Sequence, residues 1–597
     1  MSLVRGIQRL TPADDAASVR PLRLVLLALL LALLPLALEG PAQASHRSAA
    51  PSAVATFPSS RSIPPTGPIA GGSGAISLNT AIGEREGAWI VVRGATQISR
   101  SLAVAGLAPL GVEVDWAHYV SFDGKLVPDA LLPWDGVTRP AERSNQPLYV
   151  RVTVPREARP GTYRGQVIVQ ADGRNVTVPL TVKVFPVVLP PAGVARGNML
   201  TSFHLSPETY VNTASALYGF GSNEERSAAN RALYSWLATY RISPASWGFG
   251  EPRSTAGYEG SNRWWLDSAG NMRQQLEPGR FATLRVPISN NHQRRPIAGM
   301  SPSAPETWCP YLRSVHAFWS AHGWLASTVP YVYGVDEPGA AGQKLVARQA
   351  AATHGCFPGG RQLMTGRPSA SNRYLWDGRR KDDLDIWVVL LRRWYGRFTS
   401  PARQVTANRA RENLRYIDAV RRRGKMVWSY LYTGVPGTPG FRAVEPLSNP
   451  RMYLLWNALE GTDGVLYGQG TTNYRASVSP LDRVDRGGEF VLFYPGRAAP
   501  IPSARLEQIR DGLEDAALLN MVRRTRGPAA VRTILGGSGL FSANARGVEL
   551  ACTMGCALKR PHAYAWPVWS HDASTGWRIE DAKAKALKLA ARSSRGS

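Results

Sequence analysis

The sequence predicts an α/β protein with an all-β part: an N-terminal β-sandwich, a (β/α)8 TIM-type barrel and a small C-terminal extension. Between residues 75 and 191, short runs alternate apolar and polar residues with the period of two that strands show. Within 192–527, eight apolar runs from Met199 to Tyr467 alternate with helical segments over about 270 residues, which matches a (β/α)8 barrel in count and length. Neither rhythm continues through 528–597, which is predicted to be the extension.

The first 44 residues have the order of a secretory signal peptide. Two arginines precede an apolar run from Leu24 to Leu38, and Ala42-Gln43-Ala44 follows, with small residues on either side of Gln43. The apolar run has about 15 residues, fewer than the ~20 that cross a bilayer, so cleavage after Ala44 is favoured over a permanent anchor. We therefore expect a secreted or extracytoplasmic protein, free or at the cell surface, without stable membrane insertion after cleavage.

The β-sandwich is predicted from strands that follow a linker. Residues 45–74 are rich in Ser, Pro, Ala and Gly and are expected to be that linker. Pro160-Gly161 and Asp172-Gly173 mark turns between strands. The clearest alternating runs are Leu148–Val154, Gly165–Gln170 and Val176–Val184.

The barrel is predicted from eight strands and the helices between them. The expected strands are Met199–His204, Ser243–Phe249, Thr283–Ile288, Val329–Val335, Gln362–Thr365, Asp385–Leu391, Met426–Tyr432 and Gly464–Tyr467. The expected helices are Asn223–Tyr240, Thr307–Ala326, Ala341–His354, Ala407–Arg423 and Pro450–Glu460. Gly424 is a good stop signal for the fourth of these helices, because glycine readily takes the left-handed conformation that ends a helix.

The chain has 4 cysteines, and in an exported protein they favour two disulfides over a metal site. Cys309 with Cys356 would close a larger loop, and Cys552 with Cys556 would close a very small one. No second cysteine pair or metal-spaced histidine pair accompanies Cys552 and Cys556, so we expect no metal.

The composition excludes a disordered chain, with 44% hydrophobic residues and 18 Trp. The net charge of +27 would suit a polyanionic partner. The arginines are scattered, however, and the densest cluster is Arg421–Arg423. We interpret the charge as compositional bias and expect no nucleic-acid partner. No glycine-rich phosphate loop stands at a strand–helix junction, so no cofactor is expected.

The candidate catalytic residues are Asp336 and Glu337, which directly follow the fourth predicted strand. Catalytic groups of a (β/α)8 barrel sit at the carboxyl ends of its strands. Two carboxylates at the end of an apolar strand are costly unless they are solvated, paired or used. The alternative is structural: Asp336 would cap the next helix and Glu337 would pair with an arginine.

Aromatic residues at the ends of other predicted strands favour a carbohydrate ligand. These are Trp387, Trp428, Tyr430 and Tyr467, and each could instead fill the barrel. Aromatic faces stack on sugar rings, and a carboxylic acid kept neutral by dry surroundings can protonate a leaving oxygen. Together with the export signal, these aromatic residues predict that the protein acts on an extracellular carbohydrate.

Several segments carry a family resemblance that covers about residues 140–525. They are Tyr240–Pro244, Gly323–Leu325, Tyr331–Pro338, Asp385–Trp387, Tyr494–Gly496, Ile501–Glu507 and Arg510–Asp515, and the last two are the most specific. The chain resembles glycoside hydrolase family 123 and the domain of unknown function 4091 that accompanies it.

The resemblance implies a retaining β-N-acetylgalactosaminidase that acts by substrate assistance, in which the sugar's own 2-acetamido oxygen attacks the anomeric carbon. Glu337 would be the general acid and later the base, and Asp336 would hold the acetamido N–H. Tyr430, Tyr467 or Trp387 would wall the acetamido group. The oligomeric state stays open.

Arg505 has two interpretations. It could face an acidic sugar or a phosphate, and it is therefore a substrate-binding candidate. The other interpretation is a salt-bridged helix face formed by Arg505, Glu507, Arg510, Asp511, Glu514 and Asp515.

Two alternative functions stay open. One is a catalytically idle glycan-binding or cell-envelope protein, which would need no pair of carboxylates. The other is a hydrolase for a different glycan, with Glu337 as the acid and another carboxylate, such as Asp463, as the nucleophile.

Overall fold

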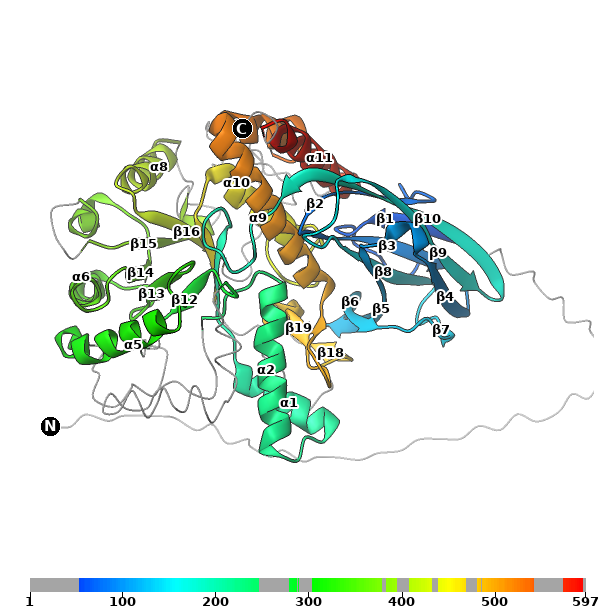
Figure 1. The fold of residues 1–597 in the computed structure, drawn as a ribbon, viewed down its shortest axis with the longest axis horizontal. Coiled ribbons are helices and arrows are strands. Elements are labelled where there is room, and N and C mark those ends of the chain that lie inside the picture. Colours follow the sequence, from blue (N-terminus) through cyan, green and yellow to red (C-terminus); the bar gives the residue numbers. More distant parts are fainter. Residues whose placement is uncertain are drawn as a thin grey trace, which may run out of the picture. The chain divides into compact units, whose positions relative to one another are not determined.

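The computed structural model describes residues 53–245, 279–286, 288, 303–377, 383–394, 407–431, 439–468, 480–484, 486–541 and 573–593 (Figure 1). They all belong to one structural unit, Ala50–Ser597. The predicted signal peptide at 1–44 and the pair Cys552 and Cys556 lie outside the described residues.

The predicted β-rich N-terminal region forms two sheets. In the six-stranded sheet the strands run in the order β1-β3-β8-β5-β18, with β6 also paired to β5, and the five-stranded sheet has the order β2-β10-β9-β4-β7. Most neighbouring strands are antiparallel, but β2–β10 and β5–β18 are parallel. The strands are β1 (Ala53–Pro58), β2 (Ile76–Ile82), β3 (Arg85–Arg93), β4 (Gln97–Ala103), β5 (Gly111–Phe122), β6 (Lys125–Pro133), β7 (Arg139–Pro140), β8 (Asn145–Thr153), β9 (Gly161–Ala171), β10 (Arg174–Val188) and β18 (Arg483–Val484).

The two sheets share one hydrophobic core, to which each contributes alternate residues, among them Ile90 and Val150 from one sheet and Val167 and Val182 from the other. The predicted turn at Asp172-Gly173 is confirmed. Both residues have positive φ (48° and 78°), and the flanking residues pair directly across the hairpin. This is the backbone geometry that an Asp-Gly turn between antiparallel strands adopts.

The prediction that 45–74 is a linker was wrong for part of that segment. Strand β1 lies within it and pairs antiparallel with β3 along its whole length. Phe57 and Ile63 are buried. The strand was missed because it is short and its Pro- and Ser-rich flanks dominate the local composition.

The central part of the chain forms a nearly closed parallel sheet of seven strands in the order β11-β17-β16-β15-β14-β13-β12. The sheet curves round so that the first strand, β11, pairs with the last, β17. The strands are β11 (Leu200–Phe203), β12 (Thr283–Arg285), β13 (Val329–Val332), β14 (Arg361–Thr365), β15 (Ile386–Leu390), β16 (Met426–Leu431) and β17 (Gly464–Tyr467).

One predicted barrel strand, Ser243–Phe249, is only partly described. Its start makes strand-like bonds to β11, since the Phe203 N–H donates to the Ser243 carbonyl (3.0 Å) and the Ala245 N–H donates to the Phe203 carbonyl (2.7 Å). Residues 246–249 lie outside the described residues. The described part of the chain therefore has seven of the eight strands expected.

Helices alternate with these strands, as predicted, and several of them cover the parallel sheet (Figure 1). No helix in the described residues is both long enough and apolar enough to span a membrane. The helices are α1 (Pro207–Tyr218), α2 (Asn223–Thr239), α5 (Cys309–Ala321), α6 (Ala340–Cys356), α7 (Leu391–Trp394), α8 (Ala407–Arg422), α9 (Asn449–Glu460), α10 (Ala504–Gly537) and α11 (Thr575–Ser593).

Local signals set the ends of these helices. At the start of α2, the Ser222 hydroxyl accepts the Glu225 N–H (3.1 Å) and the Glu225 carboxylate accepts the Ser222 N–H (2.9 Å). This reciprocal capping satisfies two of the N–H groups that a helix start leaves unpaired. Gly424 has φ 70° just after α8, as its stop signal predicted.

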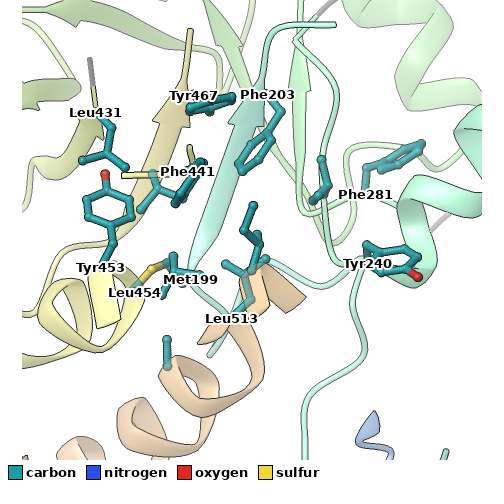
Figure 2. Packing of buried hydrophobic residues seen from close by; sticks show 14 of the residues in the cluster. Met199, Phe203, Tyr240, Phe281, Leu431, Phe441, Tyr453, Leu454, Tyr467 and Leu513 are labelled. Carbon is teal, nitrogen blue, oxygen red and sulfur yellow. The ribbon is translucent and has the colours of Figure 1, made fainter. Parts of the chain in front are cut away.

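The parallel sheet is apolar on both faces. Its inner face carries Tyr331, Val388 and Trp428, among others. The outer face packs on the helices in a larger core that also contains Phe203, Phe441 and Tyr467 (Figure 2). A sheet buried on both sides is typical of parallel strands flanked by helices.

The predicted disulfide between Cys309 and Cys356 is confirmed, with the two Cα atoms 5.1 Å apart. Cys309 begins α5 and Cys356 ends α6. The bond therefore ties together the helices on either side of β13, the strand that leads to Asp336 and Glu337.

The expected boundary at 527/528 does not separate two parts of the structure. Helix α10 continues to Gly537 past a break at Gly527, which has φ 80°. Beyond it, α11 packs against α10 and β10. At least this part of the predicted extension is integrated into the fold.

The predicted salt bridges along α10 are present, since Arg510 pairs with Glu507 and lies 3.8 Å from Glu514, but they belong to a network of buried charges that also includes α9 and α11. Arg505, Glu507, Arg510, Asp511, Glu514 and Asp515 are all buried. Their partners come from distant segments: Arg151 on β8 pairs with Glu507 (2.8 Å) and Arg451 on α9 pairs with Asp515 (2.7 Å).

The stability of the protein is expected to be greatest near pH 5, because some buried carboxyls have lowered pKa values and others have raised ones. Burial raises the pKa of Glu86, but Arg451 and Lys583 outweigh it and lower the pKa to about 2. Glu86 therefore contributes stability above its unfolded value of 4.5 that is lost as the pH falls towards 2. Burial raises the pKa of Glu84 to about 8 and of Asp115 to about 6, so their contributions are lost as the pH rises.

Thermal unfolding midpoints between pH 3 and pH 8 check this expectation. Glu84→Gln is the matched variant, because its amide cannot become charged in the folded interior and should flatten the alkaline side of the profile. A midpoint that stays constant from pH 5 to 8 in the unmodified protein would contradict the expectation, and so would an unchanged alkaline slope in Glu84→Gln.

Candidate active site

The candidate site lies where β13 ends. The chain continues from the strand through Tyr333 and Gly334 to Asp336 and Glu337. Gly334 packs closely on α6: a Cβ there would lie 2.5 Å from the side-chain oxygen of the buried Gln349, so a larger residue would displace that side chain. The carboxyl ends of parallel strands meet at one edge of a sheet, so residues that end the neighbouring strands can reach the same place.

Asp336 is held by two hydroxyl groups. The Tyr333 hydroxyl and the Thr365 Oγ1 (2.8 Å) both donate to its Oδ1. Thr365 is the last residue of β14, the strand next to β13. Two hydrogen bonds from neighbouring hydroxyl groups fix the orientation of this carboxylate.

Glu337 has an unusual backbone conformation. Its φ is 40°, in the left-handed region that side chains other than glycine seldom adopt. Its N–H donates to Thr365 Oγ1 (2.6 Å), and the Tyr430 hydroxyl donates to its Oε1. Non-glycine residues in such conformations cluster at functional sites. The side chain is exposed, so the dry surroundings expected for a catalytic acid are not provided by the described residues.

Tyr333 is a neutral donor at this site. Burial, and then the negative charge of Asp336, raise its pKa well above its ordinary value. Arg285, at the end of β12, lies over its ring with 5.7 Å from Cζ to the ring centroid and donates to its carbonyl (3.3 Å). The His204 ring, which follows β11, approaches the Tyr333 ring edge-on at 5.9 Å between centroids.

The structure brings together three of the predicted residues, Asp336, Glu337 and Tyr430. The sequence interpretation missed Tyr333, Thr365 and Arg285. Thr365 carried a usable signal, because the predicted strand Gln362–Thr365 ends on this polar residue at the same edge as Asp336. Nothing in the local sequence indicated Arg285.

The other predicted aromatic residues are buried away from solvent. Trp428 is fully buried in the inner core, with its ring centroid 5.9 Å from that of Tyr331. Trp387 is fully buried in the core between the sheet and the helices. Tyr467 packs between Phe203 and Phe441, at centroid distances of 5.5 and 4.8 Å (Figure 2), and its hydroxyl donates to the Glu489 carbonyl. As placed, none of the three offers a face to a sugar.

Arg505 is not placed to bind a substrate. It is 1% exposed, and its guanidinium binds both oxygens of Asp129 on β6, at 3.0 and 2.8 Å. It also donates to the carbonyls of Phe441 (2.7 Å) and Gly488 (2.6 Å). The guanidinium N–H groups of Arg505 are therefore occupied by protein acceptors, and they link the start of α10 to β6.

Asp463 lies at the opposite end of the sheet from Glu337. It immediately precedes β17, and its carboxylate accepts the N–H of Val427 (2.8 Å) at the beginning of β16. A nucleophile must lie on the substrate side of the general acid, about 5 Å from it. The structure therefore argues against Asp463 in that role. Among the described residues, no three His, Cys, Asp or Glu side chains form a candidate metal site.

The fold is that of a glycoside hydrolase of known structure. The chain is similar to a family 123 glycoside hydrolase from Clostridium perfringens, whose structure concerns the hydrolysis of glycolipid glycans. The TM-score is 0.59 at 13% identity, over 91% of this chain and 98% of that one. The resemblance to family 123 is thus confirmed at the level of the fold.

Two other glycoside hydrolases of known structure are much less similar in fold. A family 5 xyloglucanase from Bacteroides ovatus gives a TM-score of 0.25 at 10% identity, over 73% of this chain and 98% of that one. A family 10 xylanase from a termite gut gives 0.29 at 9% identity, over 74% and 99%. No family model matches the chain, and no curated protein matches it in sequence.

Proposed function

We propose that this protein is a secreted, retaining glycoside hydrolase that cleaves β-linked 2-acetamido sugars, such as N-acetylgalactosaminides, by substrate-assisted catalysis. One observation carries the proposal: Asp336 and Glu337, two adjacent carboxylates just beyond β13, are bound by hydroxyl groups from other strands of the same sheet. Thr365 of β14 binds Asp336, and Tyr430 of β16 binds Glu337. The similarity of fold to a family 123 hydrolase supports the proposal.

In the first step, the acetamido carbonyl oxygen of the substrate bonds to the anomeric carbon while the bond from that carbon to the glycosidic oxygen breaks. The carboxylic acid of Glu337 gives its proton to the departing oxygen. Asp336 accepts a hydrogen bond from the acetamido N–H and stabilises the positive charge of the oxazolinium ion that forms.

In the second step, water attacks the anomeric carbon and loses a proton to the Glu337 carboxylate. The bond between the anomeric carbon and the acetamido oxygen breaks, which restores the acetamido group and the protonated acid. Two inversions at one carbon leave its configuration unchanged. No protein nucleophile is needed, as in other substrate-assisted glycosidases.

Tyr430 and Tyr333 have separate parts in this scheme. Tyr430 orients Glu337 through the bond to Oε1, and Tyr333 orients Asp336. Tyr430 is also the predicted wall residue that lies beside Glu337, so we assign it rather than Trp387 or Tyr467 to that wall. A disulfide between Cys309 and Cys356 suits an oxidising, extracytoplasmic location.

The test is hydrolysis of aryl 2-acetamido-2-deoxy-β-galactosides and β-glucosides, together with a panel of acetamido glycans for an enzyme that cleaves within chains. Proton NMR of the first product should show the β-anomer. Release of the α-anomer would contradict the retaining mechanism. Binding of one glycan without turnover would instead favour a glycan-binding protein.

Asp336→Asn is expected to reduce kcat on acetamido substrates by ~100-fold, the scale of losing one electrostatic contact to a transition state. The neutral amide no longer balances the positive oxazolinium ion. The decrease should be much smaller on any slow 2-hydroxy substrate, whose reaction forms no such ion. Equal losses on both substrates would argue against a role of Asp336 at the acetamido group.

A further inference from the structure

We propose that Thr365 is the positioning residue that holds the two carboxylates in a common geometry, through one hydroxyl group bonded to both residues. The inference rests on the proposed function, because it assumes that Asp336 and Glu337 act together on one substrate. Thr365 ends β14, whereas both carboxylates lie in the segment that follows β13.

The hydroxyl of Thr365 has two opposite roles. As an acceptor it takes the N–H of Glu337 (2.6 Å), and as a donor it gives its proton to Oδ1 of Asp336 (2.8 Å). A hydroxyl has one proton to donate and lone pairs to accept with, so both bonds form at once. The Tyr333 hydroxyl, 3.3 Å away, completes the group around Asp336.

The backbone explains why such a bridge is needed. Consecutive residues of an extended strand point to opposite faces, so adjacent carboxylates would normally diverge. The positive φ of Glu337 turns the chain out of the extended form. A strained conformation of this kind persists only where surrounding contacts over-determine it, and the bond from the Glu337 N–H to Thr365 is such a contact.

Thr365 is itself fixed. It is 2% exposed, and it pairs in register with Val388 of β15 while β14 also pairs with β13. Its branched Cβ restricts χ1, which holds the hydroxyl in one direction. Because Thr365 is fixed in the sheet, its two hydrogen bonds also fix the positions of Asp336 and Glu337.

The test compares Thr365→Val, which has the same shape without the hydroxyl, with Thr365→Ser, which keeps the hydroxyl. Tyr333→Phe is the matched control, since it removes a donor to Asp336 and leaves Glu337 untouched. Each variant is assayed on aryl 2-acetamido glycosides whose leaving phenols have graded acidity. Substrates with poorer leaving groups depend more on the general acid.

We expect Thr365→Val to reduce kcat by ~100-fold with little change in KM, as small misplacements of reacting groups do. The loss should grow as the leaving group becomes poorer, because Glu337 is misplaced too. Thr365→Ser should recover most of the activity. Tyr333→Phe should lose a similar factor for every leaving group. An unchanged kcat in Thr365→Val would overturn the proposal, as would a loss that does not depend on the leaving group.

Crystal structures of the unmodified protein and Thr365→Val separate this inference from the proposed function. If the unmodified protein hydrolyses none of the acetamido substrates, the proposed function fails. The structures then decide about Thr365 by themselves. A shift of Glu337 out of its left-handed conformation in Thr365→Val supports the positioning role, and unmoved carboxylates overturn it.

Discussion

Glu337→Gln is expected to reduce kcat by ~100- to 10,000-fold on acetamido glycosides, the usual contribution of a general acid. The amide has nearly the same shape, and its oxygen can still accept the bond from Tyr430. It has no acidic proton to give to the departing oxygen and cannot take a proton from water. Initial rates across a range of substrate concentrations separate this loss of kcat from a change in KM.

Two controls make the Glu337→Gln result specific. A substrate with a very acidic leaving phenol should recover much of the first step, because its departing oxygen needs little protonation. Azide, which attacks without needing a base, should then release a β-glycosyl azide. Full activity in Glu337→Gln would place the acid elsewhere in the molecule.

Arg505→Met is expected to lower the free energy of unfolding by about 3–5 kcal/mol, the cost of breaking a buried ion pair by removing one partner. Methionine fills similar space but leaves the fully buried Asp129 without its cation. The carbonyls of Phe441 and Gly488 lose a donor as well. Urea unfolding followed by tryptophan fluorescence measures the change.

The double variant Arg505→Met with Asp129→Asn is the control, since it no longer leaves an isolated charge in the interior. It should recover part of the lost stability, which a double-mutant cycle then expresses as a coupling energy. The folded fraction of Arg505→Met should keep the KM of the unmodified protein. Native stability with a raised KM for an acidic glycan would restore the substrate-binding interpretation of Arg505.

The place of the two carboxylates could be predicted from the sequence, whereas the burial of Trp387, Trp428 and Tyr467 could not. A strand that ends in Asp336-Glu337 can be read along the chain, because catalytic residues follow strand ends in this fold. Trp387 and Trp428 look alike in sequence, each inside an apolar strand. In a parallel sheet that is buried on both faces, no alternation of apolar and polar residues tells which face a side chain occupies. Only the register between strands separates them.

The salt bridges of α10 were predicted from the sequence, but their burial was not, for a related reason. Arg and Glu residues spaced three or four apart are the usual pattern of a solvated helix face. Their burial depends on partners such as Asp129 and Arg151, which lie more than three hundred positions earlier in the chain. No local pattern in the helix could reveal partners at that distance. The same is true of Thr365, whose meaning depends on the neighbouring strand.

The buried ion pairs that join α9 and α10 to the N-terminal sheets have a consequence for protein engineering. Glu507 meets Arg151 of β8, Arg505 meets Asp129 of β6, and Arg451 meets Glu86 of β3. A truncated protein with only the parallel sheet and its helices would keep Glu507, Arg505 and Arg451 but lose all three of these partners at once. The N-terminal sheets are therefore not an excisable module, and shortened or chimeric versions should carry residues 53–188 together with the barrel.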